Sequence, residues 1–296
     1  MIKLGTQTGF ASNIGLSADE MYKIMSDLGF SSVDYSLMNG YQSELWTLTD
    51  DELKARMTAV KETMHKNGIV AGQTHSPMDA YWGKQPETKE ARWNAQIQAI
   101  KAASFLESPY IVIHPLRHPN RAHKRGYEEC KELNMEFYSF LKPYLEEYNV
   151  KAAIENMFMR DPILGRLGET VCSTAAELKD YVDTLNSDRF VVCLDVGHCV
   201  LGGQDPVSMI YELGNKYLHV THMHDNDYVD DRHMMAGMGK IDWWSIGKAL
   251  NDIGYEDIFN YEADSPFYKL GEYKKDLAVD LLRVYAEVAK EIVRVK

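Results

Sequence analysis

The sequence lacks the features that mark several classes of protein. Its four cysteines form no CxxC pair and are too few for a disulfide framework in a chain of 296 residues, which favours a reducing compartment. It has no uninterrupted run of about 18 apolar residues, and its first ten residues, MIKLGTQTGF, lack the apolar stretch of a signal peptide. We therefore expect a cytoplasmic protein that is neither secreted nor inserted into a membrane.

Positive charge is also scarce. The chain has 32 Lys and Arg against 44 Asp and Glu, a net charge of -12. Such a balance argues against a surface built to bind phosphate backbones, although a local basic groove would be compatible with it. No linker rich in Pro, Gly or Ser divides the chain, and 45% hydrophobic residues are enough for a large core. The sequence therefore predicts a single domain over residues 1–296.

Short apolar runs rich in β-forming residues alternate with longer amphipathic stretches, which is typical of repeated βα units. The eight predicted strands are Lys3–Gly9, Ser32–Leu37, Ile69–His75, Tyr110–Leu116, Val150–Met157, Phe190–Val196, Tyr217–Asp225 and Ile258–Asp264. A helix is expected after each strand. Ser17 is expected to cap the first of these helices, and Lys124–Tyr148 is the longest. Eight βα units favour a closed (β/α)8 TIM barrel over an open doubly wound sheet, which usually has fewer strands.

Polar residues stand at the carboxyl end of six predicted strands: His75, His114, Glu155, Asp195, His222 and Glu262. One such residue alone would fit a hydrogen-bonded core position, but six at matching strand ends favour a site. The carboxyl ends of barrel strands meet at one face, where the active sites of TIM barrels lie. Because three buried carboxylates would repel one another there, the pattern predicts a divalent cation between them.

Further candidates follow in the loops. His198 lies three residues after Asp195, and the Asp-x-His pair of Asp231 and His233 could bind a metal or substrate hydroxyls. The GMGKIDW segment fits either a phosphate site at a helix N-terminus or a tight turn capped by Asp242.

Two other groups have open interpretations. His224, Asp225 and Asp227 of HMHDND fit either the site or ordinary capping of the loop. Four aromatic residues after the second and third strands fit either a sugar pocket or plain packing: Tyr35, Trp46, Tyr81 and Trp82.

In order along the chain, the segments THSP, VIHP, IENM, LDVGH, HMHDND, DRH, GMGKIDW and YEAD resemble the xylose isomerase-like barrel superfamily. That superfamily includes sugar isomerases, sugar epimerases and endonuclease IV, and the resemblance covers nearly the whole chain. For the sugar epimerases it implies one divalent ion, whose ligands here are Glu155, Asp195, His222 and Glu262. In the endonuclease branch three zinc ions use further ligands, whose positions resemble His75, His114, His198, Asp231 and His233. The ligand set alone therefore fits both branches.

The surrounding sequence favours the sugar branch. The chain is acidic, and the loops after the first two strands, FASNIGLS and MNGYQSELW, have no Arg or Lys to meet phosphates. The phrasing of HMHDND and GMGKIDW is also more similar to the sugar enzymes. The resemblance thus implies a metal-dependent isomerase or epimerase of a sugar or sugar phosphate, with a small-molecule sugar rather than nucleic acid as its partner.

The expected mechanism uses one Mn2+, Mg2+, Co2+ or Zn2+ ion to polarise a substrate carbonyl. Glu155 and Glu262 would then transfer protons at the neighbouring carbon, while substrate hydroxyls would bind to His75, His114, His198, Asp231 and His233. A hydride shift would need the same polarisation. The alternatives are an endonuclease IV-like zinc phosphodiesterase on abasic DNA and a non-catalytic carbohydrate-binding barrel. The sequence is also compatible with a homo-oligomer.

Overall fold

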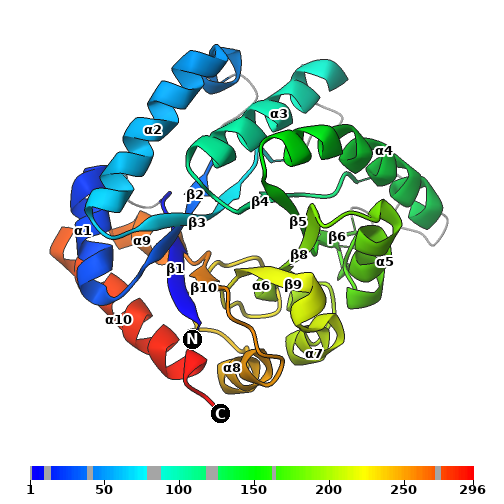
Figure 1. Ribbon diagram of the computed structural model, residues 1–296. Helices are drawn as coiled ribbons and strands as arrows, with labels where there is room; N and C mark the ends of the chain where they lie inside the picture. The colour runs from blue at the N-terminus through cyan, green and yellow to red at the C-terminus, as the bar shows by residue number, and fades with distance from the viewer. Residues whose placement is uncertain are drawn as a thin grey trace.

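Eight parallel strands surround a common axis, and helices form a ring outside them (Figure 1). The computed structural model describes residues 2–9, 15–38, 43–78, 88–117, 126–161, 165–270 and 275–296. Tyr81 and Trp82 therefore lie outside the described residues, as do residues 10–14 and 39–42 of the first two loops.

The barrel strands are β1 (Lys3–Gln7), β2 (Ser32–Ser36), β3 (Val70–His75), β4 (Tyr110–Ile113), β5 (Lys151–Glu155), β8 (Phe190–Asp195), β9 (Leu218–His222) and β10 (Ile258–Tyr261). The sheet order is β10-β1-β2-β3-β4-β5-β8-β9. A parallel bridge between Met223 and Tyr261 joins the two outer strands, so the sheet closes into a TIM barrel. The predicted fold class is confirmed.

The helices are α1 (Ala18–Leu28), α2 (Asp50–Lys66), α3 (Lys89–Phe105), α4 (Gly126–Glu147), α5 (Ala175–Leu185), α6 (Val196–Leu201), α7 (Pro206–Tyr217), α8 (Trp243–Asp252), α9 (Ser265–Leu270) and α10 (Lys275–Val293), with a 3-10 turn at Glu44–Thr47. As predicted, Ser17 caps α1, where its side chain accepts a hydrogen bond from the backbone N–H of Glu20. The predicted longest helix is α4, with 22 residues.

Two details differ from the sequence prediction. All eight predicted strands are present, but several run too long, so that His114 and Glu262 directly follow β4 and β10 instead of ending them. In addition, an antiparallel hairpin of β6 (Phe158–Arg160) and β7 (Leu167–Glu169) lies between β5 and α5. Neither of its strands was predicted, since three residues are too few to show a β pattern.

The core has two layers. Inside the barrel, small and branched side chains fill the axis: Val112, Ala153, Val191, Cys193 and Val220. A much larger apolar layer lies between the strands and the helices, and Tyr35 and Trp46 pack against it, which favours the packing interpretation for these two aromatics. All four cysteines are buried. In the described part of the chain, no helix is both long and apolar enough to cross a membrane.

Candidate metal centre

The barrel brings together the six polar residues of the strand ends. His75, Glu155, Asp195 and His222 are the last residues of β3, β5, β8 and β9. His114 and Glu262 come one residue after β4 and β10. Except for His114, which is partly buried, all of these side chains are buried. Neighbouring parallel strands in register carry their ends to the same height, which explains why residues far apart in the sequence meet here.

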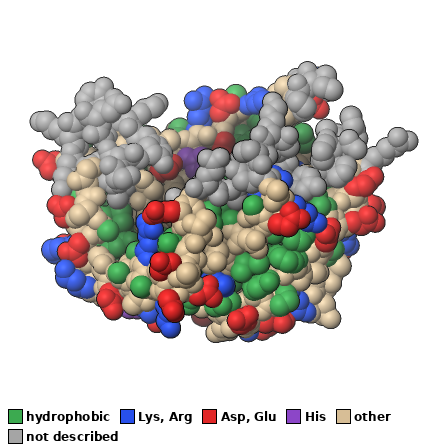
Figure 2. Space-filling view, turned by 90° about the horizontal axis from the view of Figure 1, so that it is seen from above, with side chains coloured by type: hydrophobic (Ala, Val, Ile, Leu, Met, Phe, Trp, Pro, Cys, Tyr) green, Lys and Arg blue, Asp and Glu red, His purple; other side chains and the backbone are tan. Residues whose placement is uncertain are grey.

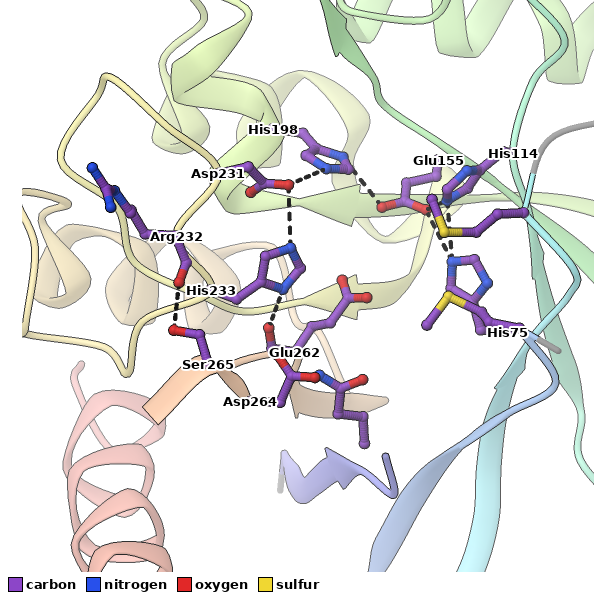
Figure 3. A pocket seen from close by; sticks show the side chains of 13 residues that line it. His75, His114, Glu155, His198, Asp231, Arg232, His233, Glu262, Asp264 and Ser265 are labelled. Atoms are coloured by element: carbon purple, nitrogen blue, oxygen red, sulfur yellow. Dashed lines mark hydrogen bonds and ion pairs between the residues drawn. The ribbon is translucent and has the colours of Figure 1, made fainter. Parts of the chain in front are cut away.

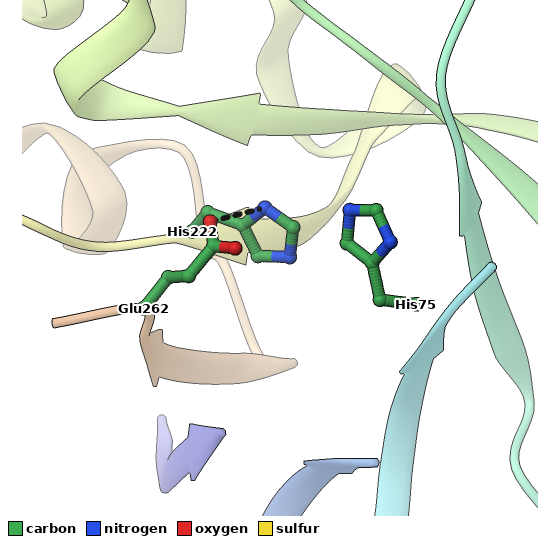
Figure 4. Close-up of side chains that lie close together, drawn as sticks. All are labelled: His75, His222 and Glu262. Carbon is green, nitrogen blue, oxygen red and sulfur yellow. Dashed lines mark ion pairs between the residues drawn. The ribbon is translucent and has the colours of Figure 1, made fainter. Parts of the chain in front are cut away.

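The Nδ1 atom of His222 lies at the centre of the predicted ligand set. It is 3.1 Å from Glu155 Oε1, 3.0 Å from Glu262 Oε2 and 3.9 Å from Asp195 Oδ2. Figure 4 shows the Glu262 carboxylate directed at the His222 ring, with His75 on the other side of it. One imidazole nitrogen therefore faces three carboxylates.

The other nitrogen of His222 contacts a residue that sequence analysis did not single out. Its Nε2 lies 3.0 Å from Asp34 Oδ2 on β2, and the same oxygen accepts a hydrogen bond of 2.8 Å from Gln73 Nε2. Because a carboxylate accepts hydrogen bonds, Asp34 holds the His222 proton on Nε2. The only hint in the sequence was an acid within an apolar strand, SSVDYSL.

The position of the His222 proton bears on whether these residues fit a cation. With its proton on Nε2, a neutral His222 presents a lone pair at Nδ1 to three acceptors, which is unfavourable unless a proton or a metal ion lies between them. One imidazole nitrogen and several carboxylate oxygens are a donor set suited to Mn2+, Mg2+, Co2+ or Zn2+. The donor chemistry of these four side chains therefore fits a divalent ion.

The pKa values of the site residues reflect the same clustering of charged groups. Burial alone would lower the pKa of His222, but neighbouring acidic groups, Glu262 and Glu155 among them, raise it well above its usual value. Burial would raise the pKa of Glu155, yet the charges of His114 and His222 hold it well below the usual range. The pKa of Glu262 is lowered by His222 in the same way, against the effect of burial. The site thus favours charged carboxylates around a positive centre.

A second cluster adjoins Glu155 on the side of β3 and β4. Glu155 Oε2 lies 2.8 Å from His114 Nε2 and 3.6 Å from His75 Nε2. The two histidines also approach each other, with 3.1 Å between their Nε2 atoms. The Nδ1–H group of His75 donates to the Ser76 carbonyl at 2.9 Å. This trio is one of several groups of side chains close enough to hold an ion.

A third cluster comes from the loops. Asp231 Oδ2 lies 3.5 Å from His198 Nε2 and 3.2 Å from His233 Nε2, and the Nδ1 of His233 donates to the Glu262 carbonyl at 2.6 Å (Figure 3). Burial lowers the pKa of His233, but the hydrogen bond to Asp231 and the nearby carboxylate charges together outweigh burial and raise the pKa to about 10. The three predicted loop residues therefore lie together beside the strand-end residues.

The glycine-rich loop forms the capped turn and not the phosphate site. The backbone N–H groups of Gly237 and Gly239 both donate to Asp225 Oδ2, at 2.9 Å each. Asp242 caps α8 by accepting from the backbone N–H of Ser245 at 3.2 Å. The loop amides that could have bound phosphate are thus directed at a carboxylate of the same chain. Asp227 has the ordinary loop role, since it accepts from the backbone N–H of Val229 at 2.9 Å.

A cavity of about 280 Å³ opens above these clusters. Its described lining is Gln7, Met38, His75, Met78, His114, Glu155, His198, Asp231, Arg232, His233, Glu262, Asp264 and Ser265. Figure 3 shows the histidines and carboxylates of this lining pointing toward one another. Arg232 is paired with Asp230 at 2.9 Å and Asp227 at 3.4 Å. On the face shown in Figure 2, acidic and basic side chains are mixed and histidine reaches the surface near the upper edge.

The chain is similar to known proteins in sequence and in fold. The family described as Xylose isomerase-like TIM barrel matches residues 22–284. One curated relative is an uncharacterised protein of Methanocaldococcus jannaschii, which is 28% identical over 55% of this chain and 54% of that protein. Inosose isomerase of Bacillus subtilis is 26% identical over 58% of this chain and 60% of that protein. A probable endonuclease 4 of Metamycoplasma arthritidis is 25% identical over 55% of this chain and 58% of that protein. Each of these matches spans a little over half of the relative.

Solved structures share the fold over nearly the whole chain. D-psicose 3-epimerase with D-tagatose from Clostridium cellulolyticum is 19% identical with a TM-score of 0.71, and the match covers 99% of this chain and 98% of that one. The IolI protein with a bound zinc atom is 19% identical with a TM-score of 0.73, again over 99% and 98%. At this identity the likeness is one of fold.

Proposed function

The chain belongs to the xylose isomerase-like TIM barrel family, and on that premise we propose that it is a divalent-metal-dependent sugar isomerase or epimerase. One observation carries the proposal. His222 Nδ1 faces Glu155, Asp195 and Glu262, while its Nε2 contacts Asp34. Glu155 and Glu262 also line the cavity. Inosose isomerase is among the sequence relatives, and a D-psicose 3-epimerase is among the proteins that share the fold.

We assign the metal to Glu155, Asp195, His222 and Glu262, one residue from each of four successive strands of the barrel. A divalent ion bound there would supply Lewis acidity toward a carbonyl oxygen and a neighbouring hydroxyl of an open-chain sugar. His75, His114, His198, Asp231 and His233 line the cavity above and would bind the other hydroxyls.

Proton transfer is assigned to Glu155 and Glu262. Glu155 ends β5 and Glu262 directly follows β10, three positions away around the barrel, and both also line the cavity. Their carboxylates reach the His222 ring from different strands, with oxygens 3.1 and 3.0 Å from Nδ1. A base on one side of a carbon and an acid on the other are what inversion next to a carbonyl requires. Held carboxylates lose little freedom in reaching that arrangement.

A second candidate function rests on the two flanking clusters. His75 and His114 with Glu155, and Asp231 with His198 and His233, have the spacing of further metal sites. A site with three zinc ions would suit a phosphodiesterase on abasic DNA, and one relative is named probable endonuclease 4. The net charge of -12 makes this the weaker candidate. A carbohydrate-binding barrel without activity is the third.

Two assays separate these functions. Protein purified without added metal is analysed for its metal content, and we expect about one ion per chain. The same protein is then incubated with a panel of free and phosphorylated ketoses and aldoses in deuterated water and, separately, with an abasic-site duplex. Conversion of a sugar with deuterium at the reacting carbon supports the proposal, and conversion without deuterium indicates a hydride shift. Three ions with efficient nicking of the duplex would establish the endonuclease instead.

A further inference from the structure

His224 is a fully buried histidine of the HMHDND segment that the proposed mechanism does not use. It lies two residues after the proposed ligand His222, just beyond the end of β9. Its Nε2 is 3.0 Å from Asp195 Oδ1 and 3.1 Å from Asp195 Oδ2. Its Nδ1 is buried and has no hydrogen-bond partner among the residues that the structure describes. A proton on Nδ1 would have no acceptor, so the favoured tautomer carries it on Nε2 and donates it to Asp195.

Both oxygens of Asp195 lie within hydrogen-bond distance of His224 Nε2, but their other contacts differ. Oδ1 accepts from His224 and also from the backbone N–H of His198, at 2.6 Å. Oδ2 is the oxygen that faces the rest of the site, 3.9 Å from His222 Nδ1 and 3.7 Å from His198 Nδ1. Asp195 is therefore fixed so that Oδ2 points to the position assigned to the metal.

The faces of the His224 ring are also occupied. One face stacks on His233, with 4.2 Å between ring centroids and an angle of 1° between the planes. On another side the ring lies against Gly197, where an added Cβ would come within 1.9 Å of His224 Cε1. Only glycine leaves room for the imidazole at this point, which gives the glycine of LDVGH a structural reason.

We propose that His224 is a positioning residue for the metal, which holds Asp195 by a hydrogen bond and supports His233 by stacking. This inference rests on the proposed ligand set of Glu155, Asp195, His222 and Glu262. His224 would link the metal, through Asp195, to a residue of the cavity lining, through His233. Partners of this kind typically change metal affinity by about 10–100-fold when they are removed.

The test uses His224→Phe, which keeps a flat ring for stacking but cannot donate to Asp195. The dissociation constant of Mn2+ is measured by chelator competition, and the Tm is measured in EDTA. We expect affinity to fall about 10–100-fold. The matched control is His219→Phe at the opposite end of the barrel, where His219 Nδ1 pairs with Asp257 at 3.0 Å. That variant also loses a histidine-carboxylate pair, a partly exposed one, and should bind Mn2+ within about twofold of the wild type.

A second variant, His224→Gln, separates the hydrogen bond from packing and guards against a misfolded Phe variant. Its amide can donate to Asp195 without the ring, so we expect it to recover most of the lost affinity. Wild-type affinity in both variants would overturn the inference while leaving the proposed ligand set intact. Loss of binding in the Gln variant equal to that in the Phe variant would also overturn it. If the wild type itself bound no Mn2+, the proposed metal site would fail as well.

Discussion

Two kinds of buried carboxylate lie near the same mouth of the barrel, and they are neutralised differently. Asp225 is fully buried three residues after His222, and Glu155 is equally buried at the end of β5. Asp225 receives N–H groups from the loop and helix start that follow it. Oδ2 accepts from Gly237, Gly239 and the Trp243 indole, and Oδ1 from Ile241 and Asn226.

Glu155 has no such set of neutral donors. Among the described residues, its oxygens lie near the imidazoles of His75, His114, His198 and His222, at 2.8–3.6 Å. An amide proton cannot leave, whereas an imidazole proton can be exchanged for a metal ion. The comparison teaches that burial of a carboxylate does not by itself indicate a metal. The hydrogen-bond partners of the carboxylate distinguish the two cases, and of these two carboxylates only the one contacted by histidines is suited to bind a cation.

The largest effect should come from a carboxylate of the second kind. Glu262→Gln keeps the side chain's size and an oxygen for the metal but removes the proton acceptor. Turnover of an active sugar should fall by about 10²-fold or more, with metal content near that of the wild type. Steady-state kinetics and metal analysis check this. Glu169→Gln, on the exposed hairpin strand β7, is the control and should keep full activity. Full activity of the Glu262 variant would exclude Glu262 from proton transfer.

The corresponding substitution at Asp225, the carboxylate bound by N–H groups, should lower stability and leave the metal site unaffected. Asp225→Asn turns one acceptor oxygen into an amide that faces donors, so some of the five N–H groups lose their partner. We expect a loss on the order of 3 kcal/mol in the free energy of unfolding, seen as a lower midpoint in denaturant. Metal stoichiometry of the folded variant should stay unchanged. If the metal were lost while the fold stayed intact, Asp225 would belong to the metal site.

The same comparison shows how far the sequence could go. The eight strands and their polar ends were predictable because apolar β runs recur between helices and polar residues interrupt them at one end. That signal is identical for Asp195 and for Asp225, since both are acids at the end of an apolar run. Asp195 accepts one backbone N–H, from His198, whereas Asp225 accepts four. Three of those four come from residues 237–241, and no local pattern shows that this loop folds back onto Asp225.

Asp34 illustrates the other limit. A single acid within the second strand gives no hint that it will meet His222, which lies 188 positions later in the sequence. The contact arises from the inward alternation of side chains on β2 and β9 across the barrel. The roles of the nine predicted site residues stay predictions, although the structure places all nine in or directly beneath one cavity.

Metal binding at the histidine-bound carboxylates should depend on pH. The pKa of His222 is raised above its usual 6.5. Binding of the second imidazole proton, the one at Nδ1, therefore stabilises the metal-free fold fully below the usual pKa of 6.5, and this contribution is lost as pH rises through the raised pKa. A metal ion at Nδ1 must displace that proton. Affinity for Mn2+ should therefore rise by up to about tenfold per pH unit between pH 6 and 8. Calorimetry in buffers of different ionisation enthalpy counts the released proton. An affinity independent of pH would place the ion elsewhere.

The smallest effect concerns a single donor to Asp225. Trp243→Phe removes the indole N–H that donates to Oδ2 at 2.9 Å and otherwise keeps a buried ring. The chain contains a matched control, because the indole N–H of Trp93 is buried without a hydrogen-bond partner among the described residues. Both changes lose similar apolar volume, so their difference isolates the hydrogen bond. Since a bond to a charged acceptor contributes about 1.5–3 kcal/mol, Trp243→Phe should cost about that much more in unfolding free energy than Trp93→Phe. Equal losses of unfolding free energy in the two variants would show that the other four donors, all backbone N–H groups, satisfy Asp225 by themselves. The difference between Asp225 and Glu155 would then come from backbone donors only.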